Sequence, residues 1–148
     1  MLTAKASIEH LDKLYEIEKA CFAKEAFTKH QLARLLGDPD SVALISQVEG
    51  ETVGFIIGKV RAKTKPASGH ILTIDVLPEH RHKGVGRRLL QEIEAEFTDK
   101  CVKICCLEVR EDNTPALNLY ERSGYKKVGR LKNYYGKQHG IRLRKVLA

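Results

Sequence analysis

The chain lacks any long apolar run. It has 148 residues and passes from Met1-Leu2-Thr3-Ala4-Lys5 directly into an amphipathic pattern, so neither a signal peptide nor a membrane span is visible. It also lacks internal repeats, low-complexity tracts and a recognisable linker. These absences predict a single domain over residues 1–148 and a cytoplasmic location.

Cysteine is scarce, and its spacing does not predict a metal site. Cys105 and Cys106 are neighbours in an apolar run, while Cys21 and Cys101 have no partner at a metal-ligand spacing. Reduced thiols in the core are expected, because a redox role would need an exposed thiolate of low pKa. Solvated loop positions without a metal are likewise expected for three histidines, His80, His82 and His139.

The charge is unbalanced toward the basic side. The formal net charge is +7, with local concentrations in residues 81–88 and 122–144 rather than in one arm. A polyanion is therefore an expected partner, whether nucleic acid, an anionic membrane surface, an acidic peptide or a multiply phosphorylated cofactor. Charge alone does not choose among them, but the spread argues against a plain nucleic-acid tail. Hydrophobic residues make up 43% and charged residues 30%, which is typical of a globular fold.

The first half of the chain predicts a short strand, two helices and a hairpin. Residues 2–6 read as a strand, and Ser7 can cap a helix that reaches Cys21. Thr28 can cap a second helix that stops at Gly37. Two apolar runs, 42–48 and 52–60, flank a glycine-containing turn and predict an antiparallel pair.

The second half alternates strands and helices. It predicts a strand over 70–77, a helix over 84–98 and a central strand over 102–109. Thr114-Pro115 predicts the capped start of a short helix that stops at Gly124. Two closing strands, 125–131 and 141–147, are expected around a polar loop that contains Tyr134 and Tyr135.

A basic glycine turn lies between the strand over 70–77 and the helix that follows. A helix start directs free backbone N–H groups and a positive dipole end at one point, which suits an anion. Gly84 and Gly86 would let a phosphate approach the backbone, and Lys83 and Arg87 add positive charge. The turn has neither a Walker lysine nor a third glycine at the dinucleotide spacing, so those two nucleotide patterns do not fit.

This stretch carries a family resemblance. Residues 74–90, IDVLPEHRHKGVGRRLL, closely resemble the acetyl-CoA motif of GNAT acetyltransferases. Residues 107–113, LEVREDN, and 116–125, ALNLYERSGY, resemble the next strand and helix of that fold. Asn133-Tyr134-Tyr135 resembles the RimI-like branch, whose members acetylate protein N-termini. The resemblance implies an α/β GNAT fold over the whole chain, with a mixed sheet of six to seven strands flanked by about four helices.

The resemblance also implies a cofactor site for acetyl-CoA. Ile74, Asp75 and Val76 would offer backbone groups to the acetyl-pantetheine arm, although many relatives have a small apolar residue where this chain has Asp75. Asn113 and Tyr120 would contact the arm near the sulfur. The pyrophosphate would bind at the turn and helix start, through Arg81, His82, Lys83, Gly84, Val85, Gly86 and Arg87.

Acetyl transfer to an amine needs a proton acceptor, a stabilised oxyanion and a protonated leaving sulfur. Glu108 is the acidic residue in the apolar run 104–109, where burial is expected to raise its pKa. RimI-like enzymes use the matching glutamate as base, whereas the structural alternative is a glutamate paired with Arg110 or a lysine. Tyr120 would protonate the sulfur, and the alternative is a core aromatic; both can hold at once.

The resemblance is less specific at the residues that would bind the acceptor. The resemblance places Phe22 among the substrate-side helices, and it assigns the grip on the first peptide units to Tyr134 and Tyr135. It implies a protein or peptide N-terminus as acceptor, a ribosomal protein being one candidate. A lysine side chain or a small amine is the alternative acceptor, and a basic RNA-binding module without turnover is the alternative function. No membrane partner is expected, and nucleic acid is not expected as substrate. The protein is expected to be a monomer or a weak dimer.

Overall fold

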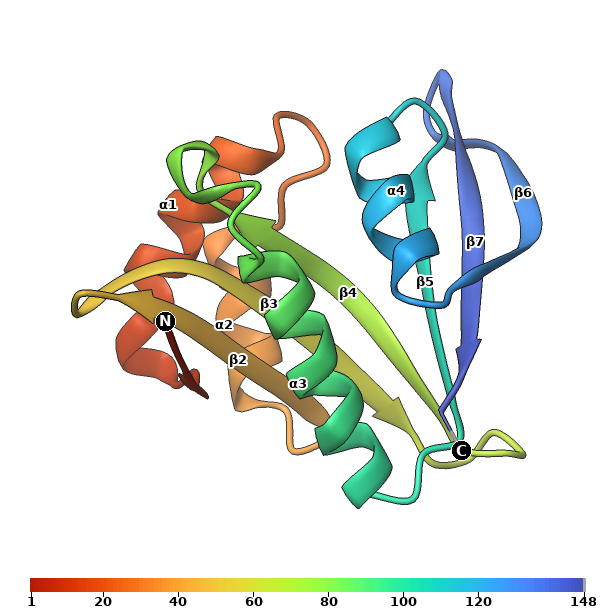
Figure 1. Ribbon diagram of the computed structural model, residues 1–148, viewed down its shortest axis with the longest axis horizontal. Helices are drawn as coiled ribbons and strands as arrows, with labels where there is room; N and C mark the ends of the chain where they lie inside the picture. The colour runs from red at the N-terminus through yellow and green to blue at the C-terminus, as the bar shows by residue number, and fades with distance from the viewer. Residues whose placement is uncertain (148) are drawn as a thin grey trace.

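The computed structural model describes residues 1–147 and consists of one mixed sheet with helices on both faces (Figure 1). The sheet has seven strands in the order β1-β2-β3-β4-β5-β7-β6. They are β1 (Leu2–Lys5), β2 (Ser41–Val48), β3 (Glu51–Arg61), β4 (Ser68–Val76), β5 (Ile104–Arg110), β6 (Lys126–Tyr135) and β7 (Gln138–Val146). All neighbouring strands are antiparallel except β4 and β5, which are parallel.

The helices form two layers. The four α-helices of residues 1–147 are α1 (Leu11–Cys21), α2 (Lys29–Gly37), α3 (Val85–Asp99) and α4 (Thr114–Arg122), with short 3-10 helices η1 (Ile8–His10) and η2 (Pro78–His80). Helices α1 and α2 cover one face of the sheet, while α3 and α4 cover the other (Figure 1). No helix among the described residues is long and apolar enough to cross a bilayer.

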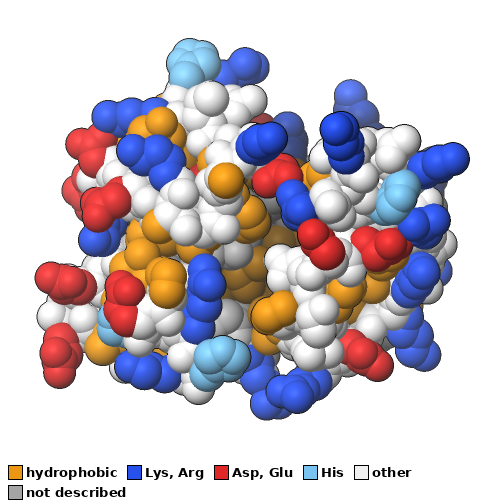
Figure 2. Space-filling view, turned by 90° about the horizontal axis from the view of Figure 1, so that it is seen from above, with side chains coloured by type: hydrophobic (Ala, Val, Ile, Leu, Met, Phe, Trp, Pro, Cys, Tyr) orange, Lys and Arg blue, Asp and Glu red, His pale blue; other side chains and the backbone are white. Residues whose placement is uncertain are grey.

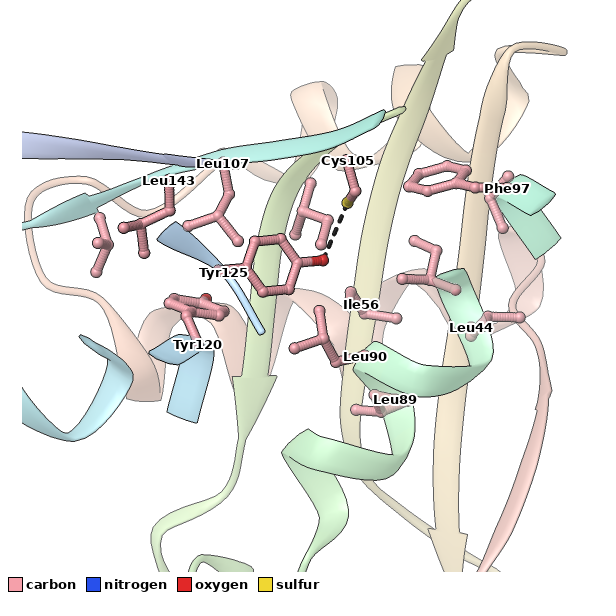
Figure 3. Close-up of a cluster of buried hydrophobic side chains, with 14 of the residues drawn as sticks. Leu44, Ile56, Leu89, Leu90, Phe97, Cys105, Leu107, Tyr120, Tyr125 and Leu143 are labelled. Carbon is pink, nitrogen blue, oxygen red and sulfur yellow. Dashed lines mark hydrogen bonds between the residues drawn. The ribbon is translucent and has the colours of Figure 1, made fainter. Parts of the chain in front are cut away.

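The larger core lies beneath α3 and α4 (Figure 3). Phe97 of α3 is fully buried and lies flat on Gly69 of β4, where a Cβ atom would come within 2.5 Å of its ring. Tyr125 lies inside this core (Figure 3), and its hydroxyl donates to Glu94 at 2.8 Å and contacts the Cys105 sulfur at 3.1 Å. The four cysteines are free thiols, but the expected core position holds only for Cys105: Cys21 and Cys106 are partly exposed and Cys101 is exposed.

A bulge in β4 changes which face its side chains occupy. Ile57 of β3 pairs with Thr73, but Gly58 pairs with Ile71, so Leu72 is an extra residue on β4. Before the bulge, Ile71 packs into the core under α3; after it, Thr73 turns toward α1. Asp75, two residues further on, shares the face of Thr73.

Most expected elements are confirmed, and two details are wrong. Asn113, not Thr114, caps α4, since its Oδ1 accepts from the Ala116 N–H at 3.2 Å. Tyr134 and Tyr135 lie in β6 rather than in a loop. The hairpin is tighter than expected because Gly136, at φ +74°, makes the turn at once after Tyr135, which pairs with Gln138.

Candidate active site

Strands β4 and β5 pair at one end and diverge at the other. Their register runs only from Ser68↔Ile104 to His70↔Cys106, and the rest of β4 has no partner on that side (Figure 1). The Leu77 N–H bonds to Val53 of β3, so by antiparallel alternation the N–H groups of Ile74 and Val76 point away from β3. Backbone donors of Ile74 and Val76 therefore line the gap, whereas Asp75, which pairs with Phe55, directs its N–H toward β3.

The basic turn follows η2 and opens α3. Gly84 is the N-cap at φ +84°, its end of the helix has no side-chain cap, and no acidic residue stands in the first turn. A Cβ on Gly84 would meet nothing within 4 Å, so the space in front of the helix is open. His82 also has a positive φ of 61°, which tightens the turn. This arrangement fits a pyrophosphate, because unpaired N–H groups and positive charge meet there.

The members of the turn contribute in different ways. The Arg81 Nε donates to the Val76 carbonyl at 3.0 Å, so its guanidinium ties the turn to the end of β4. Val85 is buried in the core and can serve a ligand only through its backbone. Of the other expected residues, His82, Lys83 and Arg87 are solvent-exposed, and Gly86 is partly exposed.

Glu108 lies on β5, two residues beyond the last β4–β5 pair. Its Oε1 is 2.7 Å from His70 Nε2, and its Oε2 accepts from Arg142 Nε at 3.3 Å. The side chain is only 9% exposed, and burial acts to raise its pKa. The hydrogen bonds from His70 and Arg142, together with the positive charge of Arg142, outweigh burial, however, and hold the pKa of Glu108 below its ordinary value. The expectation of a raised pKa for Glu108 is therefore wrong, and its partners are neither Arg110 nor a lysine.

His70 was not singled out by the sequence, although it is a histidine in an otherwise apolar strand. Arg61 NH2 lies 2.9 Å from His70 Nδ1, and a guanidinium can only donate. Nδ1 therefore accepts, and the ring is the neutral tautomer whose Nε2–H donates to Glu108. His70 thus orients the Glu108 carboxylate without taking up its charge.

Tyr120 of α4 is buried with its ring against Tyr125, at 5.9 Å between centroids (Figure 3). Its hydroxyl makes no hydrogen bond to any described residue. Burial raises the pKa of Tyr120, which lies near Asp75 of β4 and Tyr135 of β6. The hydroxyl therefore stays protonated, close to both β4 and β6, as a proton donor would require.

Asn113 holds the start of α4. Its Oδ1 is used in the helix cap, which leaves its side-chain N–H₂ group as the donor that a ligand in the gap could use.

A groove lies between the segment after α1 and the β6–β7 turn. Arg110 of β5 lines the groove and ties the segment after α1 to the sheet, since its NH1 donates to Glu25 at 2.6 Å. Tyr135 lines the groove, with its ring 4.9 Å from that of Tyr134, which is 51% exposed. Burial, Tyr134 and Glu108 raise the pKa of Tyr135 to about 12. Glu108 is two residues before Arg110 on the same face of β5. The groove is lined by Ala23, Lys24, Glu25, Arg110, Tyr135, Gly136, Lys137 and Gln138.

The expected substrate residue Phe22 caps the C-terminus of α1 but does not line this groove; its N–H bonds to the Glu18 carbonyl at 2.9 Å. Figure 2 looks onto the end of the sheet where β4 and β5 diverge. It shows a hollow with a hydrophobic floor, with Lys and Arg and also Asp and Glu side chains around its edge. Among residues 1–147, no cluster of His, Cys, Asp or Glu could hold a metal ion.

Comparisons with known proteins agree with this geometry. Residues 11–125 match the acetyltransferase (GNAT) family. The N-alpha-acetyltransferase of Sulfurisphaera tokodaii is 29% identical over 139 residues, which are 88% of this chain and 83% of that protein. The N-alpha-acetyltransferase RimI of Mycobacterium tuberculosis is 35% identical over 102 residues, 69% of this chain and 63% of that protein.

A solved structure shares the fold. The crystal structure of the ribosomal-protein-S18-alanine N-acetyltransferase from Escherichia coli superposes with a TM-score of 0.89 at 22% identity, covering 99% of this chain and 94% of that one. The expected fold and the RimI-like resemblance are thus confirmed. The open edge of β4 and the uncapped start of α3 fit the pantetheine arm and the pyrophosphate of acetyl-CoA. The chain belongs to the acetyltransferase (GNAT) family and is an acetyl-CoA-dependent N-acetyltransferase.

Proposed function

We propose that this enzyme transfers the acetyl group of acetyl-CoA to the N-terminal α-amine of proteins or peptides, ribosomal proteins among them. The names of its relatives favour an α-amine acceptor. The observation that carries the proposal is the setting of Glu108, which is held ionised by His70 at 2.7 Å and Arg142 at 3.3 Å. A carboxylate with two such partners is a weak base.

A weak base limits the choice of amine. An α-amine has a pKa of about 8 and a lysine amine about 10.4, so near neutral pH the neutral, nucleophilic fraction of the α-amine is roughly 250-fold larger. Glu108 does not need to deprotonate a ground-state ammonium if an appreciable fraction of the acceptor, about a tenth for an α-amine at pH 7, is already neutral. It needs only to accept the proton that becomes acidic as the C–N bond forms. The α-amine meets this condition, whereas a lysine does not.

The remaining residues have complementary roles in this proposal. Acetyl-CoA supplies a thioester whose carbonyl the amine attacks. The N–H groups of Ile74 and Val76 in the gap are placed to polarise a carbonyl oxygen. Glu108 accepts the amine proton, and the Tyr120 hydroxyl donates one to the departing sulfur. Tyr135 and the Arg110–Glu25 pair flank the groove through which the acceptor chain enters.

A panel of acetyl acceptors tests the proposal. The enzyme is incubated with acetyl-CoA and with peptides that have a free N-terminus, with the same peptides blocked at the N-terminus but containing lysine, and with polyamines. We expect mass spectrometry to place the acetyl group on the α-amine of the free peptides. Acetylation confined to lysines or polyamines, with free and blocked peptides treated alike, would reject the proposed acceptor.

A further inference from the structure

Two carboxyl groups meet in the interior between α1 and β4. Glu18 lies in the last turn of α1 and Asp75 near the end of β4, and each is 1% exposed. Thr73 lies between them: its Oγ1 is 2.9 Å from Glu18 Oε1 and 2.6 Å from Asp75 Oδ1. The second oxygen of Asp75, Oδ2, is buried and has no partner among the described residues.

Counting protons assigns the ionisation state of this cluster. The Thr73 hydroxyl has one proton and can donate to only one of the two carboxyl groups. The other short contact must be donated by a carboxylic acid. Glu18 Oε2 accepts the Phe27 N–H at 3.0 Å, so Glu18 is well satisfied as a carboxylate. The consistent arrangement is an Asp75 acid that donates to Thr73, which in turn donates to Glu18.

The surroundings agree with a protonated Asp75. The charged and titratable groups that face it are Glu18 and Cys21 from α1, Arg81 from the turn after η2, and Tyr120 from α4. Burial, and then Glu18, raise the pKa of Asp75 well above its ordinary range. Arg81 offsets this only weakly, since its guanidinium bonds to the Val76 carbonyl and to Cys21. An acid also leaves Oδ2 as an unpaired carbonyl oxygen, which costs less than an unpaired carboxylate oxygen.

The cluster connects the two sides of the active site. Through the Phe27 N–H, Glu18 fixes the segment of residues 22–27, which we call the substrate loop, just before the Thr28 cap of α2. Ala23, Lys24 and Glu25 of this loop line the groove. Thr73 and Asp75 belong to the strand whose edge faces the gap. The cluster therefore sets the distance between the groove wall and the strand that lines the cofactor gap.

We propose that Asp75 and Glu18 share one proton through Thr73, and that this protonated cluster positions the substrate loop against β4. The positioning part rests on the proposed acceptor, because it concerns a peptide in the groove. Loss of the proton would leave two buried carboxylates on one hydroxyl, and the loop would lose its anchor. Glu18, Thr73 and Asp75 are thus positioning residues for the acceptor.

The first test measures the proton itself. Asp75→Asn keeps the shape and can donate from its amide to Thr73, so it imitates the acid at every pH. Since the folded state favours the protonated acid, wild-type stability is full below the ordinary pKa of an aspartate and falls as the pH rises through the raised pKa of Asp75. We expect the Tm of Asp75→Asn to exceed that of wild type by a margin that grows from acidic to alkaline pH.

Infrared spectroscopy detects the same proton directly. We expect the band of a protonated carboxylic acid in the wild type at neutral pH and its loss in Asp75→Asn. A margin independent of pH, or no such band, would overturn the shared proton.

The second test measures the loop. Thr73→Val removes the hydroxyl at nearly constant shape, and Thr73→Ser is the matched control that retains it. We expect Thr73→Val to raise the KM for a free peptide about tenfold, as loss of one charge-assisted hydrogen bond would, with the KM for acetyl-CoA unchanged. Thr73→Ser should keep the wild-type values. Equal changes in both KM values, or none in either, would overturn the positioning role. If no peptide is acetylated while the infrared and Tm results hold, the proposed acceptor fails and the shared proton stands.

Discussion

The two ends of β4 differ in whether β5 pairs with them. At the paired end, Ser68–His70 bond to β5, and Gly69 lies under the ring of Phe97 with no free space. At the open end, Ile74 and Val76 direct N–H groups into a gap, and Asp75 keeps an oxygen without a partner. Unpaired polar groups reduce the stability of a fold. Where β4 and β5 diverge, however, the unpaired backbone N–H groups are available to form hydrogen bonds with a ligand. Substitutions at the two ends should therefore be detected by different measurements.

The largest effect is expected beyond the paired end, at Glu108. Glu108→Gln keeps the shape and the bond from His70 but cannot accept a proton. We expect kcat to fall by about 10²–10⁴-fold, the range of general base catalysis, with Tm nearly unchanged. Initial rates with acetyl-CoA and a free peptide measure this.

The matched control for Glu108→Gln is Glu16→Gln. Glu16 is also in an ion pair, with Lys13, but it lies on α1 with its side chain 70% exposed. Its removal should leave kcat at the wild-type value. Wild-type turnover in Glu108→Gln would show that another group accepts the proton.

At the paired end, Gly69→Ala should reduce stability rather than chemistry. The new Cβ would lie 2.5 Å from two ring atoms of Phe97, which is fully buried and cannot turn away. Overpacking of this kind costs about 1–3 kcal/mol. Thermal or denaturant unfolding should show the loss, while kcat measured well below the Tm should stay close to wild type.

Gly129→Ala is the control for this change, because a Cβ on Gly129 of β6 meets nothing within 4 Å. It should leave the free energy of unfolding nearly unchanged. Equal free energies of unfolding for Gly69→Ala and Gly129→Ala would show that the contact with Phe97 does not set the cost.

The sequence predicted much of the paired end. Phe97 follows the four-residue spacing of Val85, Leu89 and Ile93, and such periodicity reports directly on the buried face of a helix. Helix stops at glycine were equally readable, since Gly124 adopts φ +96° after α4. Local backbone preference and burial determine these features, so one segment contains all of the information.

The open end was predicted only in part. Glu108 and Tyr120 were found through resemblance, but the direction of the Glu108 pKa was not, because it depends on partners from β4 and β7 far away in sequence. The β4 bulge at Leu72 has no local signal, yet it turns Thr73 toward Glu18. Contacts between residues 55 positions apart in the chain follow from the register of the whole sheet.

The smallest effect is expected at Arg142, directly opposite Glu108 on β7. Arg142→Gln removes one of the two partners that lower the pKa of Glu108, while burial, which raises it, remains. Because the carboxylate is the active form, the acid limb of the kcat profile should move to higher pH, by less than about one unit since the Arg142 side chain is 48% exposed. Arg144→Gln, two residues along the same face of β7, is the control and should not move the limb. If the acid limb of Arg142→Gln does not move, Arg142 does not lower the pKa of Glu108. The hydrogen bond from His70 would then be the interaction that keeps Glu108 ionised and makes it too weak a base for a lysine acceptor.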